Sequence, residues 1–411
     1  MTSVSPHTGG EQPDSRYAWG RLAIALGLAT IGGIGLWSVV VALPAIEAEF
    51  GVDRGGASIP YFATMIGFAI GGVMMGRLTD KFGIRRPVIL GALSISIGYI
   101  AASQATSMWQ FILAQAVLIG MFGSSATFGP LVADVTLWFV RRRGIAVAIV
   151  ASGNYLAGTI WPPILQHLIE AYGWRTAHLS IGVFCFVTML PLAMALGKRR
   201  ITTEPEVATS AGTVTAKARM SPNGLQVLLI VASVSCCIAM AMPQVHIVAY
   251  CFDLGYGVAR GAEMLSLILG FGIVSRLISG WIADRIGGVR TLLVGSSLQF
   301  LALLFYIPFD GLASLYIVSA FFGLAQGGIV PSYALIVREY FPAREAGARV
   351  SLVMMSTIAG MGIGGWMTGE IYDLTGSYQV AFLNGIAFNL VNMSIAFWLL
   401  AGRPGAARAV A

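Results

Sequence analysis

Long apolar stretches separated by short polar loops follow one another along almost the whole chain. A transmembrane helix needs about 20 mostly apolar residues in a row, and twelve stretches meet this requirement. We expect helices at residues 21–43, 57–76, 87–104, 108–137, 144–169, 175–197, 224–252, 262–283, 289–308, 311–337, 346–369 and 379–401. The pattern predicts an all-α membrane protein with twelve transmembrane helices.

One connection, residues 198–222, is longer and more polar than the others and divides the predicted helices into two groups of six. We therefore expect two six-helix bundles with polar segments before, between and after them. In chain order the predicted parts are a cytoplasmic tail at 1–16, a bundle at 17–197, a cytoplasmic linker at 198–222, a bundle at 223–401 and a cytoplasmic tail at 402–411.

The composition is that of a chain surrounded by lipid. Hydrophobic residues make up 57% of the 411 residues and charged residues only 10%, which is too little charge to cover a soluble protein. The net charge of +7 sits in short loops, so it indicates membrane orientation and not a nucleic-acid partner. The cysteines lack the spacing of a metal site, and we expect no metal and no other cofactor.

The positions of the basic residues predict the orientation. All but four of the 25 lysines and arginines fall in the tails or at the loops on one side of the predicted helices. The exceptions are Arg54, Arg175 and Arg260 on the opposite side and Arg276 inside a helix. Because basic loops stay in the cytoplasm, both termini should be cytoplasmic. Arginine far outnumbers lysine, which favours a bacterial inner membrane.

Two loops on the predicted cytoplasmic side share one pattern. Residues 76–86 read GRLTDKFGIRR and residues 280–290 read GWIADRIGGVR. Self-similarity at an offset of half the chain is typical of two parallel repeats. The shared positions, which we expect to form a gate, are Gly76, Asp80, Lys81, Gly83, Arg86, Gly280, Asp284, Arg285, Gly287 and Arg290.

Each position of this gate motif has a physical reason. The first glycine, Gly76 or Gly280, lets two helices approach closely. Asp80 and Asp284 lie at helix ends, where a carboxylate accepts hydrogen bonds from a neighbouring helix N-terminus or pairs with arginine. The second glycine of each copy permits a sharp turn.

With this motif in both loops, residues 17–401 resemble the major facilitator superfamily. The resemblance implies two pseudo-symmetric bundles that rock about a central site, with Asp80 and its basic neighbours latching the cytoplasmic side in the outward-open state. The segments WFVRRRGIAVAIVASG at 138–153 and GEIYDLTGSY at 369–378 are similar to the monocarboxylate-porter branch, whose pattern oxalate/formate exchangers largely share. Arg276 matches the substrate-binding arginine of that branch by helix and position.

Arg276 is the one basic side chain deep inside a predicted helix. A charge at this depth is costly and marks a functional site by default. It lies roughly 6 Å from the predicted midplane, at 1.5 Å per residue, and a guanidinium binds a carboxylate through two parallel hydrogen bonds. The alternative role is a structural ion pair with an acid such as Asp134.

A single deep cation favours a substrate with one negative charge. The exchangers supply a second cation as a lysine in the helix that corresponds to 346–369, which has no lysine here. Animal members of the porter branch use a lysine in the first helix as the proton acceptor, and 21–43 has none either. If protons move with the anion, another residue must carry them.

His246, Tyr250 and Asp253 recur at the spacing of one helix face. A histidine can carry a proton or donate a hydrogen bond to a substrate oxygen, and Asp253 can relay protons or cap its helix. Asp134, the one acid well inside a predicted helix, can pair with the arginines at 141–143, serve the gate or titrate. We expect a structural or gating role for Asp134.

Further polar residues within the predicted helices complete the candidate site. Tyr333 follows a proline and can donate a hydrogen bond to a carboxylate. Asn154, Tyr61, Trp37 and Gln326 fit helix packing as well as pocket lining.

These observations predict a secondary transporter of a small organic anion, foremost a monocarboxylate such as lactate or pyruvate, working as a monomer by alternating access. Its predicted partners are the small carboxylate, the lipid bilayer and, if transport is proton-coupled, protons. The alternatives are an oxalate/formate-type exchanger, a carrier of an unrelated solute and a non-transporting sensor on the same fold. No zinc motif or other acid–base pair indicates an enzyme.

Overall fold

The computed structural model of the chain describes residues 13–197 and 221–401, and the predicted linker lies almost wholly outside them. Eleven helical stretches in the described part are long and apolar enough to cross a membrane. One of them, Gly144–Ala195, turns back on itself at Gly173, whose φ of 78° no ordinary residue adopts easily. Divided there, it makes two crossings, so the described helices match the twelve predicted spans.

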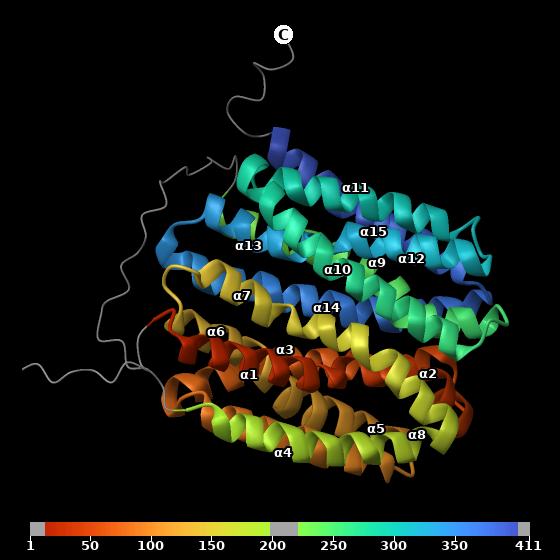
Figure 1. Cartoon of the computed structure of the whole chain (residues 1–411). Helices are drawn as coiled ribbons and strands as arrows, with labels where there is room; N and C mark the ends of the chain where they lie inside the picture. Colours follow the sequence, from red (N-terminus) through yellow and green to blue (C-terminus); the bar gives the residue numbers. More distant parts are fainter. Residues whose placement is uncertain (1–12, 198–220, 402–411) are drawn as a thin grey trace, which may run out of the picture.

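The helices before residue 198 gather in the lower part of Figure 1 and those after residue 220 in the upper part. The first group is α1 (Arg16–Gly32), α2 (Ile34–Phe50), α3 (Arg54–Phe82), α4 (Arg85–Ser103), α5 (Met108–Leu113), the π-helix η1 (Ala114–Gly123), the 3-10 turn η2 (Ser124–Thr127), α6 (Gly129–Trp138), α7 (Arg143–Ala151) and α8 (Gly153–Ala195). The second is α9 (Pro222–Asp253), α10 (Val258–Ile286), α11 (Gly288–Tyr306), α12 (Leu312–Gln326), α13 (Ile329–Tyr340), α14 (Ala343–Thr375) and α15 (Tyr378–Ala401). We call these groups the N-half and the C-half.

Two crossings are broken at equivalent places in the two halves. In the N-half, the helix breaks between Gly123 and Phe128, and in the C-half it breaks at Gly327 and Gly328. Gly123 and Gly327 stand 204 residues apart, the offset of the repeated loops. A broken helix frees backbone carbonyls, which is tolerated at membrane depth only inside the protein. The carbonyl of Gly327 is therefore available to a buried donor.

The repeated loops turn in the same way. Gly83 ends α3 at φ 76°, ψ 166°, and Gly287 ends α10 at φ 83°, ψ 166°, so both glycines make the predicted turns. The expected close approach at Gly76 and Gly280 is wrong for this conformation. A Cβ added at either position would have no neighbour within 4 Å, because the helices do not pack against another element there.

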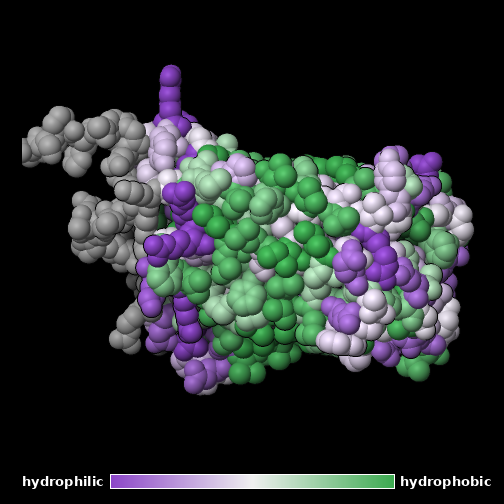
Figure 2. Space-filling model, turned by 90° about the horizontal axis from the view of Figure 1, so that it is seen from below, coloured by the Kyte–Doolittle hydropathy of each residue, from purple (hydrophilic) through white to green (hydrophobic). Residues whose placement is uncertain are grey.

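The molecule has two polar ends and an apolar waist, which Figure 2 shows on one face. Large apolar side chains point outward along the waist, with Ile317 71% and Phe397 64% exposed. We call the end that contains residues 16, 197 and 221 the tail end, and the opposite end, with residues 54, 253 and 373, the far end. An apolar waist between polar ends is the surface of a multi-pass membrane protein.

A buried ion pair joins α1 to α6 near the tail end. Arg21 donates to both carboxylate oxygens of Asp134, at 2.8 and 2.9 Å, and each residue is 3% exposed. The Arg21 guanidinium also lies over the Trp138 ring, 4.9 Å from its centroid. Asp134 is thus held by Arg21, a residue that the sequence had placed merely among the orienting charges.

The end of the predicted N-terminal tail is docked on the N-half. Asp14 accepts hydrogen bonds from the backbone N–H groups of Val140, Arg141 and Arg142, at 3.2, 3.1 and 3.3 Å. These donors, the Arg141 amide foremost, lower the pKa of the Asp14 carboxyl. The tail predicted for 1–16 therefore contributes at least its last residues to the fold.

Replacing Asp134 by alanine should leave the Arg21 charge buried without a counter-charge, which costs about 3–5 kcal/mol. We expect a clear fall in the melting temperature of the purified protein. The double variant Arg21→Met with Asp134→Leu should recover most of it, because the pair is replaced by apolar packing. Arg260→Ala, which breaks an exposed pair with Glu263, is the control and should change Tm little. A double variant as unstable as the single one would contradict this account.

Candidate functional site

Arg276 of α10 lies where the two halves meet. Its Nε donates to the Gly327 carbonyl in the break between α12 and α13, at 3.5 Å, and its Nη1 donates to the Ala151 carbonyl of α7 at 3.4 Å. Its guanidinium carbon lies 4.2 Å from the centroid of the Tyr155 ring on α8. The side chain is therefore held by one carbonyl from each half and a ring from the N-half.

These contacts leave most of the guanidinium unused. Arginine has five N–H donors, and the two hydrogen bonds made here are long. No carboxylate within residues 13–197 or 221–401 forms an ion pair with Arg276, and the alternative partner Asp134 is occupied by Arg21. A planar cation with spare donors and an aromatic support can accept a carboxylate in the bidentate geometry.

The surroundings of Arg276 differ toward the two ends of the molecule. Residues four apart lie on one face of a helix, so Gly272 and Gly280 flank Arg276 along α10. A Cβ at Gly272 would lie 2.5 Å from the Tyr155 ring, whereas a Cβ at Gly280 would meet nothing within 4 Å. The face of α10 that carries Arg276 is thus filled toward the far end and unfilled toward the tail end.

Polar residues from both halves lie close to this point. In the N-half, the Trp37 indole donates to the Asn154 backbone and side-chain oxygens, both at 3.3 Å, and Asn154 directly precedes Tyr155. In the C-half, Gln244 of α9 donates to the side-chain oxygen of Gln326, the last residue of α12. Asn154 and Gln326, both candidates from the sequence, therefore directly precede the two residues Tyr155 and Gly327 that contact Arg276.

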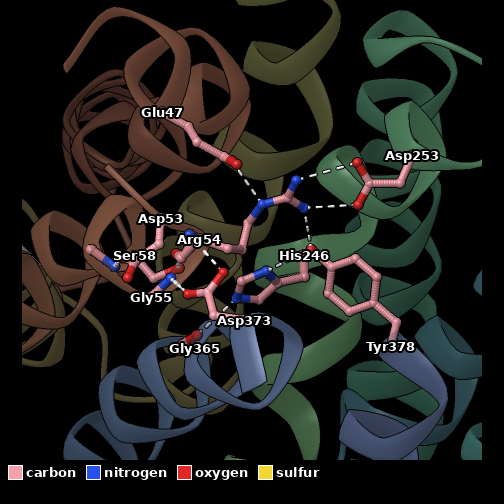
Figure 3. A network of polar contacts seen from close by, with 11 residues as sticks. Glu47, Asp53, Arg54, Gly55, Ser58, His246, Asp253, Gly365, Asp373 and Tyr378 are labelled. Atoms are coloured by element: carbon pink, nitrogen blue, oxygen red, sulfur yellow. Dashed lines mark hydrogen bonds and ion pairs between the residues drawn. The ribbon is translucent and has the colours of Figure 1, made fainter. Parts of the chain in front are cut away.

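A second polar cluster closes the far end, and Arg54 is its centre (Figure 3). Arg54, 4% exposed, donates to Glu47 of its own half at 2.7 Å and to both oxygens of Asp253 in the C-half at 3.0 and 3.2 Å. It also donates to the Tyr378 hydroxyl at 2.5 Å. One guanidinium therefore binds three elements, α2, α9 and α15, from opposite halves.

The N-terminus of α3 strengthens this closure. Asp373 of α14 accepts from the backbone N–H groups of Arg54 and Gly55, at 3.0 and 2.6 Å. The first N–H groups of a helix have no partner within the helix, and a carboxylate there also meets the positive end of the helix dipole. Asp373 thus caps a helix of the other half.

His246 belongs to this far-end cluster and not to the surroundings of Arg276. Its Nε2 lies 2.7 Å from the Gly365 carbonyl, which can only accept, and its Nδ1 lies 3.2 Å from the Tyr378 hydroxyl. The Tyr378 hydroxyl accepts from Arg54, and its direction toward Nδ1 depends on the tautomer of His246. Both ring nitrogens are engaged with protein groups in this structure, and a direct contact of His246 with substrate stays a prediction.

Three other sequence candidates are placed by packing. Tyr250 stacks its ring edge against Tyr378, with centroids 5.3 Å apart, so it supports the far-end cluster with its neighbour Asp253. Tyr61 packs on Gly365. Tyr333 is wholly buried and donates to Asn392 of α15 at 2.7 Å. Its hydroxyl is already used within the C-half, so we remove Tyr333 from the candidate substrate site.

The charged members of the gate motif lie at the tail end and are exposed. They are Asp80, Lys81, Arg86, Asp284, Arg285 and Arg290. Arg285 lies over the Trp281 ring of its own helix, 3.4 Å from the centroid, and Lys81 and Arg86 lie over Phe82. In this conformation the halves are fastened at the far end, opposite to the gate motif.

Sequence reasoning missed Arg54 and Tyr155. Arg54 was assigned to an outer loop. A basic residue on the side of the membrane that has few basic residues is itself a signal of a specific partner. Tyr155 carried no signal, because an aromatic residue in an apolar helix is ordinary core packing. Only the crossing of α8 with α10 brings it under the guanidinium.

Comparisons with known proteins agree with this architecture. Residues 25–319 match the family described as Major Facilitator Superfamily. Monocarboxylate transporter 13 of Bos taurus is 26% identical over 402 residues, covering 94% of this chain and 90% of the relative. Agnestins efflux protein AgnL12 of Paecilomyces divaricatus is 24% identical over 405 residues, covering 96% and 91%.

Solved structures share the fold at low sequence identity. A peptide transporter POT in complex with sulfate has a TM-score of 0.74 at 15% identity, covering 96% of each chain. A bacterial homolog of the human lysosomal transporter Spinster, in an inward-facing and occupied conformation, has a TM-score of 0.71 at 13% identity, covering 96% of this chain and all of the other.

Removing the Arg54 guanidinium should open the far end. We expect Arg54→Ala to raise the ratio of far-end-open to closed molecules roughly tenfold, about 1.4 kcal/mol, a value kept low because Glu47 and Asp253 are partly exposed. Spin labels on cysteines at Thr106 and Ala313, exposed on opposite halves, should report a longer distance. The native cysteines are replaced for this measurement.

Arg175→Ala is the matched control for this experiment. Arg175 pairs with Glu49 within the N-half, so its loss should leave the distance between the labels unchanged. An unchanged distance in Arg54→Ala would mean that the far-end cluster does not hold the halves together.

Proposed function

The chain belongs to the Major Facilitator Superfamily, and we propose that it is a carrier, not an enzyme, for a small organic anion, foremost a monocarboxylate such as lactate or pyruvate. The observation that carries the proposal is the guanidinium of Arg276, held between the halves by two carbonyls and a ring and paired with no described carboxylate. An uncompensated charge in an apolar bundle attracts a counter-ion. A carboxylate of the solute supplies it.

The charge of the solute follows from the number of cations at the site. Arg276 is the one cationic side chain that the described residues place where α8, α10 and α12 meet. A monocarboxylate neutralises it, whereas a dicarboxylate would leave one negative charge unpaired at a high desolvation cost. The name of the relative from Bos taurus, Monocarboxylate transporter 13, supports the same class.

The mechanism we propose is alternating access. In this conformation the far end is closed by Arg54, and the face of α10 that carries Arg276 is unfilled toward the tail end. With the tail end in the cytoplasm, as the basic loops predict, the solute leaves or enters from inside the cell. Binding at Arg276, which touches both halves, then alters the balance between the two closures.

Proton coupling is assigned to the far-end cluster. Asp134 is engaged with Arg21 inside the N-half, which favours a structural role for it. His246 instead contacts Tyr378, and Asp253 pairs with Arg54 of the other half, so both belong to the cluster that closes the far end. We propose them as the proton-linked residues if transport requires protons.

Export is a second candidate for the direction of transport. The fungal relative is named an efflux protein, which favours export of the solute. The curated relatives reported above come from a mammal and a fungus, so the bacterial host rests on the arginine excess alone. Uptake into proteoliposomes measured in both orientations distinguishes import from export.

Arg276→Ala should abolish transport at ordinary solute concentrations. Losing one partner of a buried charge pair costs about 2–5 kcal/mol, so the KM for labelled lactate in proteoliposomes should rise at least about thirtyfold. Arg276→Lys should recover only part of the loss, because an ammonium keeps the charge but not the planar fork.

Arg260→Ala provides the control, since Arg260 is exposed and forms its ion pair with Glu263 of the same helix, away from Arg276. It should transport lactate like the wild type. Full uptake by Arg276→Ala would refute the proposed role, and competition by sugars but not by carboxylates would refute the solute class.

A further inference from the structure

We infer that the Gln326 amide donates a hydrogen bond to an oxygen on the carbon next to the carboxylate of the solute. The site then prefers 2-oxo and 2-hydroxy monocarboxylates over unsubstituted ones of the same size. This inference rests on the proposed function, because it assumes that Arg276 holds the carboxylate. It adds a specificity-determining residue, with Gln244 as its positioning residue.

The first observation is an unsatisfied donor. Gln326 is 0% exposed, its side-chain oxygen accepts from Gln244, and its Nε2 has no hydrogen-bond partner among the described residues. A buried amide N–H without a partner is costly, and such groups are rare in native proteins. In the amide orientation of this structure Gln244 donates to the Gln326 oxygen, so the end left free is the N–H donor.

The second observation is the place of that donor. A Cβ at Gly272 would lie 3.7 Å from Gln326 Nε2 and 2.5 Å from the Tyr155 ring. The same ring lies against the Arg276 guanidinium, and Arg276 donates to Gly327, the residue after Gln326. The free amide and the Tyr155 ring therefore both lie beside Gly272, one helical turn from Arg276 toward the far end.

The helix crossing that creates this geometry leaves little freedom. A Cβ at Gly327 would lie 2.2 Å from the Gly272 carbonyl, and one at Gly323 would lie 2.4 Å from the Ile268 carbonyl. The backbones of α10 and α12 thus touch along this stretch, as small residues allow. Gln326 is held in place by backbone contact and by Gln244 rather than by a flexible loop.

The chemistry of the two donors selects the solute. A guanidinium takes the carboxylate, and a neighbouring neutral N–H donor takes an oxygen on the adjacent carbon. A ketone oxygen and a hydroxyl oxygen both accept, while a methylene leaves the amide unpaired. The Gln326 amide is buried in this structure, with the Tyr155 ring of the N-half beside the same glycine, Gly272, and we expect the donor to become accessible when the halves move apart.

Competition for labelled lactate uptake in proteoliposomes tests the inference, with pyruvate, lactate and propionate as competitors. In the wild type, propionate should compete about tenfold more weakly than lactate, the range of one neutral hydrogen bond. Gln326→Met should bring the ratio of the two inhibition constants close to one by weakening lactate and pyruvate, with propionate unchanged. A general loss of folding would weaken all three.

Gln299→Met is the matched control. Gln299 of α11 is also a wholly buried glutamine with an unpartnered Nε2, but it contacts Cys236 of α9 and not the surroundings of Arg276. It should keep the wild-type ratio. If Gln326→Met does not fold, Gln244→Met replaces it and should lower the ratio about two- to threefold, because the amide is then free to rotate.

The competition assay distinguishes the role of Gln326 from the proposed function. Equal competition by the three acids in the wild type, or an unchanged ratio in Gln326→Met, overturns the role of Gln326 and leaves an anion carrier. Absence of competition by any monocarboxylate overturns both.

Discussion

A guanidinium inside an apolar bundle needs a counter-charge, and this constraint gives three arginines three different roles. Arg21 finds Asp134 in its own half, so that pair is fixed whatever the halves do. Arg54 pairs with Glu47 in its own half and with Asp253 in the other half, so its pair with Asp253 joins the halves at the closed far end. Arg276 has carbonyls and a ring but no described carboxylate, and the proposed function pairs its charge with the solute. The position of the acidic partner therefore distinguishes a structural arginine, an arginine that joins the halves and an arginine proposed to bind the solute.

The architecture was predictable from the sequence to a large extent. Apolar length gave the twelve crossings, and the repeated loops gave the pseudo-symmetry, because both depend on local composition and spacing. Gly83 and Gly287 were assigned to turns on chemistry alone, and both have positive φ. Gly76 and Gly280 were expected in close packing and are not, since packing at that end depends on the conformation of the whole molecule and not on the motif.

The site was predictable only where a single residue carried the signal. Arg276 stood out because a charge at membrane depth has few explanations. Tyr155, Gln244 and the Asp373 cap needed the crossing of helices far apart in sequence, which periodicity does not give. For His246 the sequence indicated the helix face but not the contacts. Its helix face was assigned correctly with Asp253, yet its contacts with Gly365 and Tyr378 depend on α14 and α15.

The central site and the far-end cluster are connected through α9. Gln244 holds Gln326 beside Arg276, and two residues later His246 reaches Tyr378, which accepts from Arg54. Physical continuity alone does not establish coupling between sites, which requires an element with two arrangements that both sites bias. The Arg54–Asp253 pair joins the halves, and in the alternating-access mechanism proposed above it breaks when the far end opens. A solute that neutralises Arg276 between the same two halves acts on the same equilibrium, so the anion site and the far-end closure are linked through the rigid-body motion even without the chain of contacts along α9.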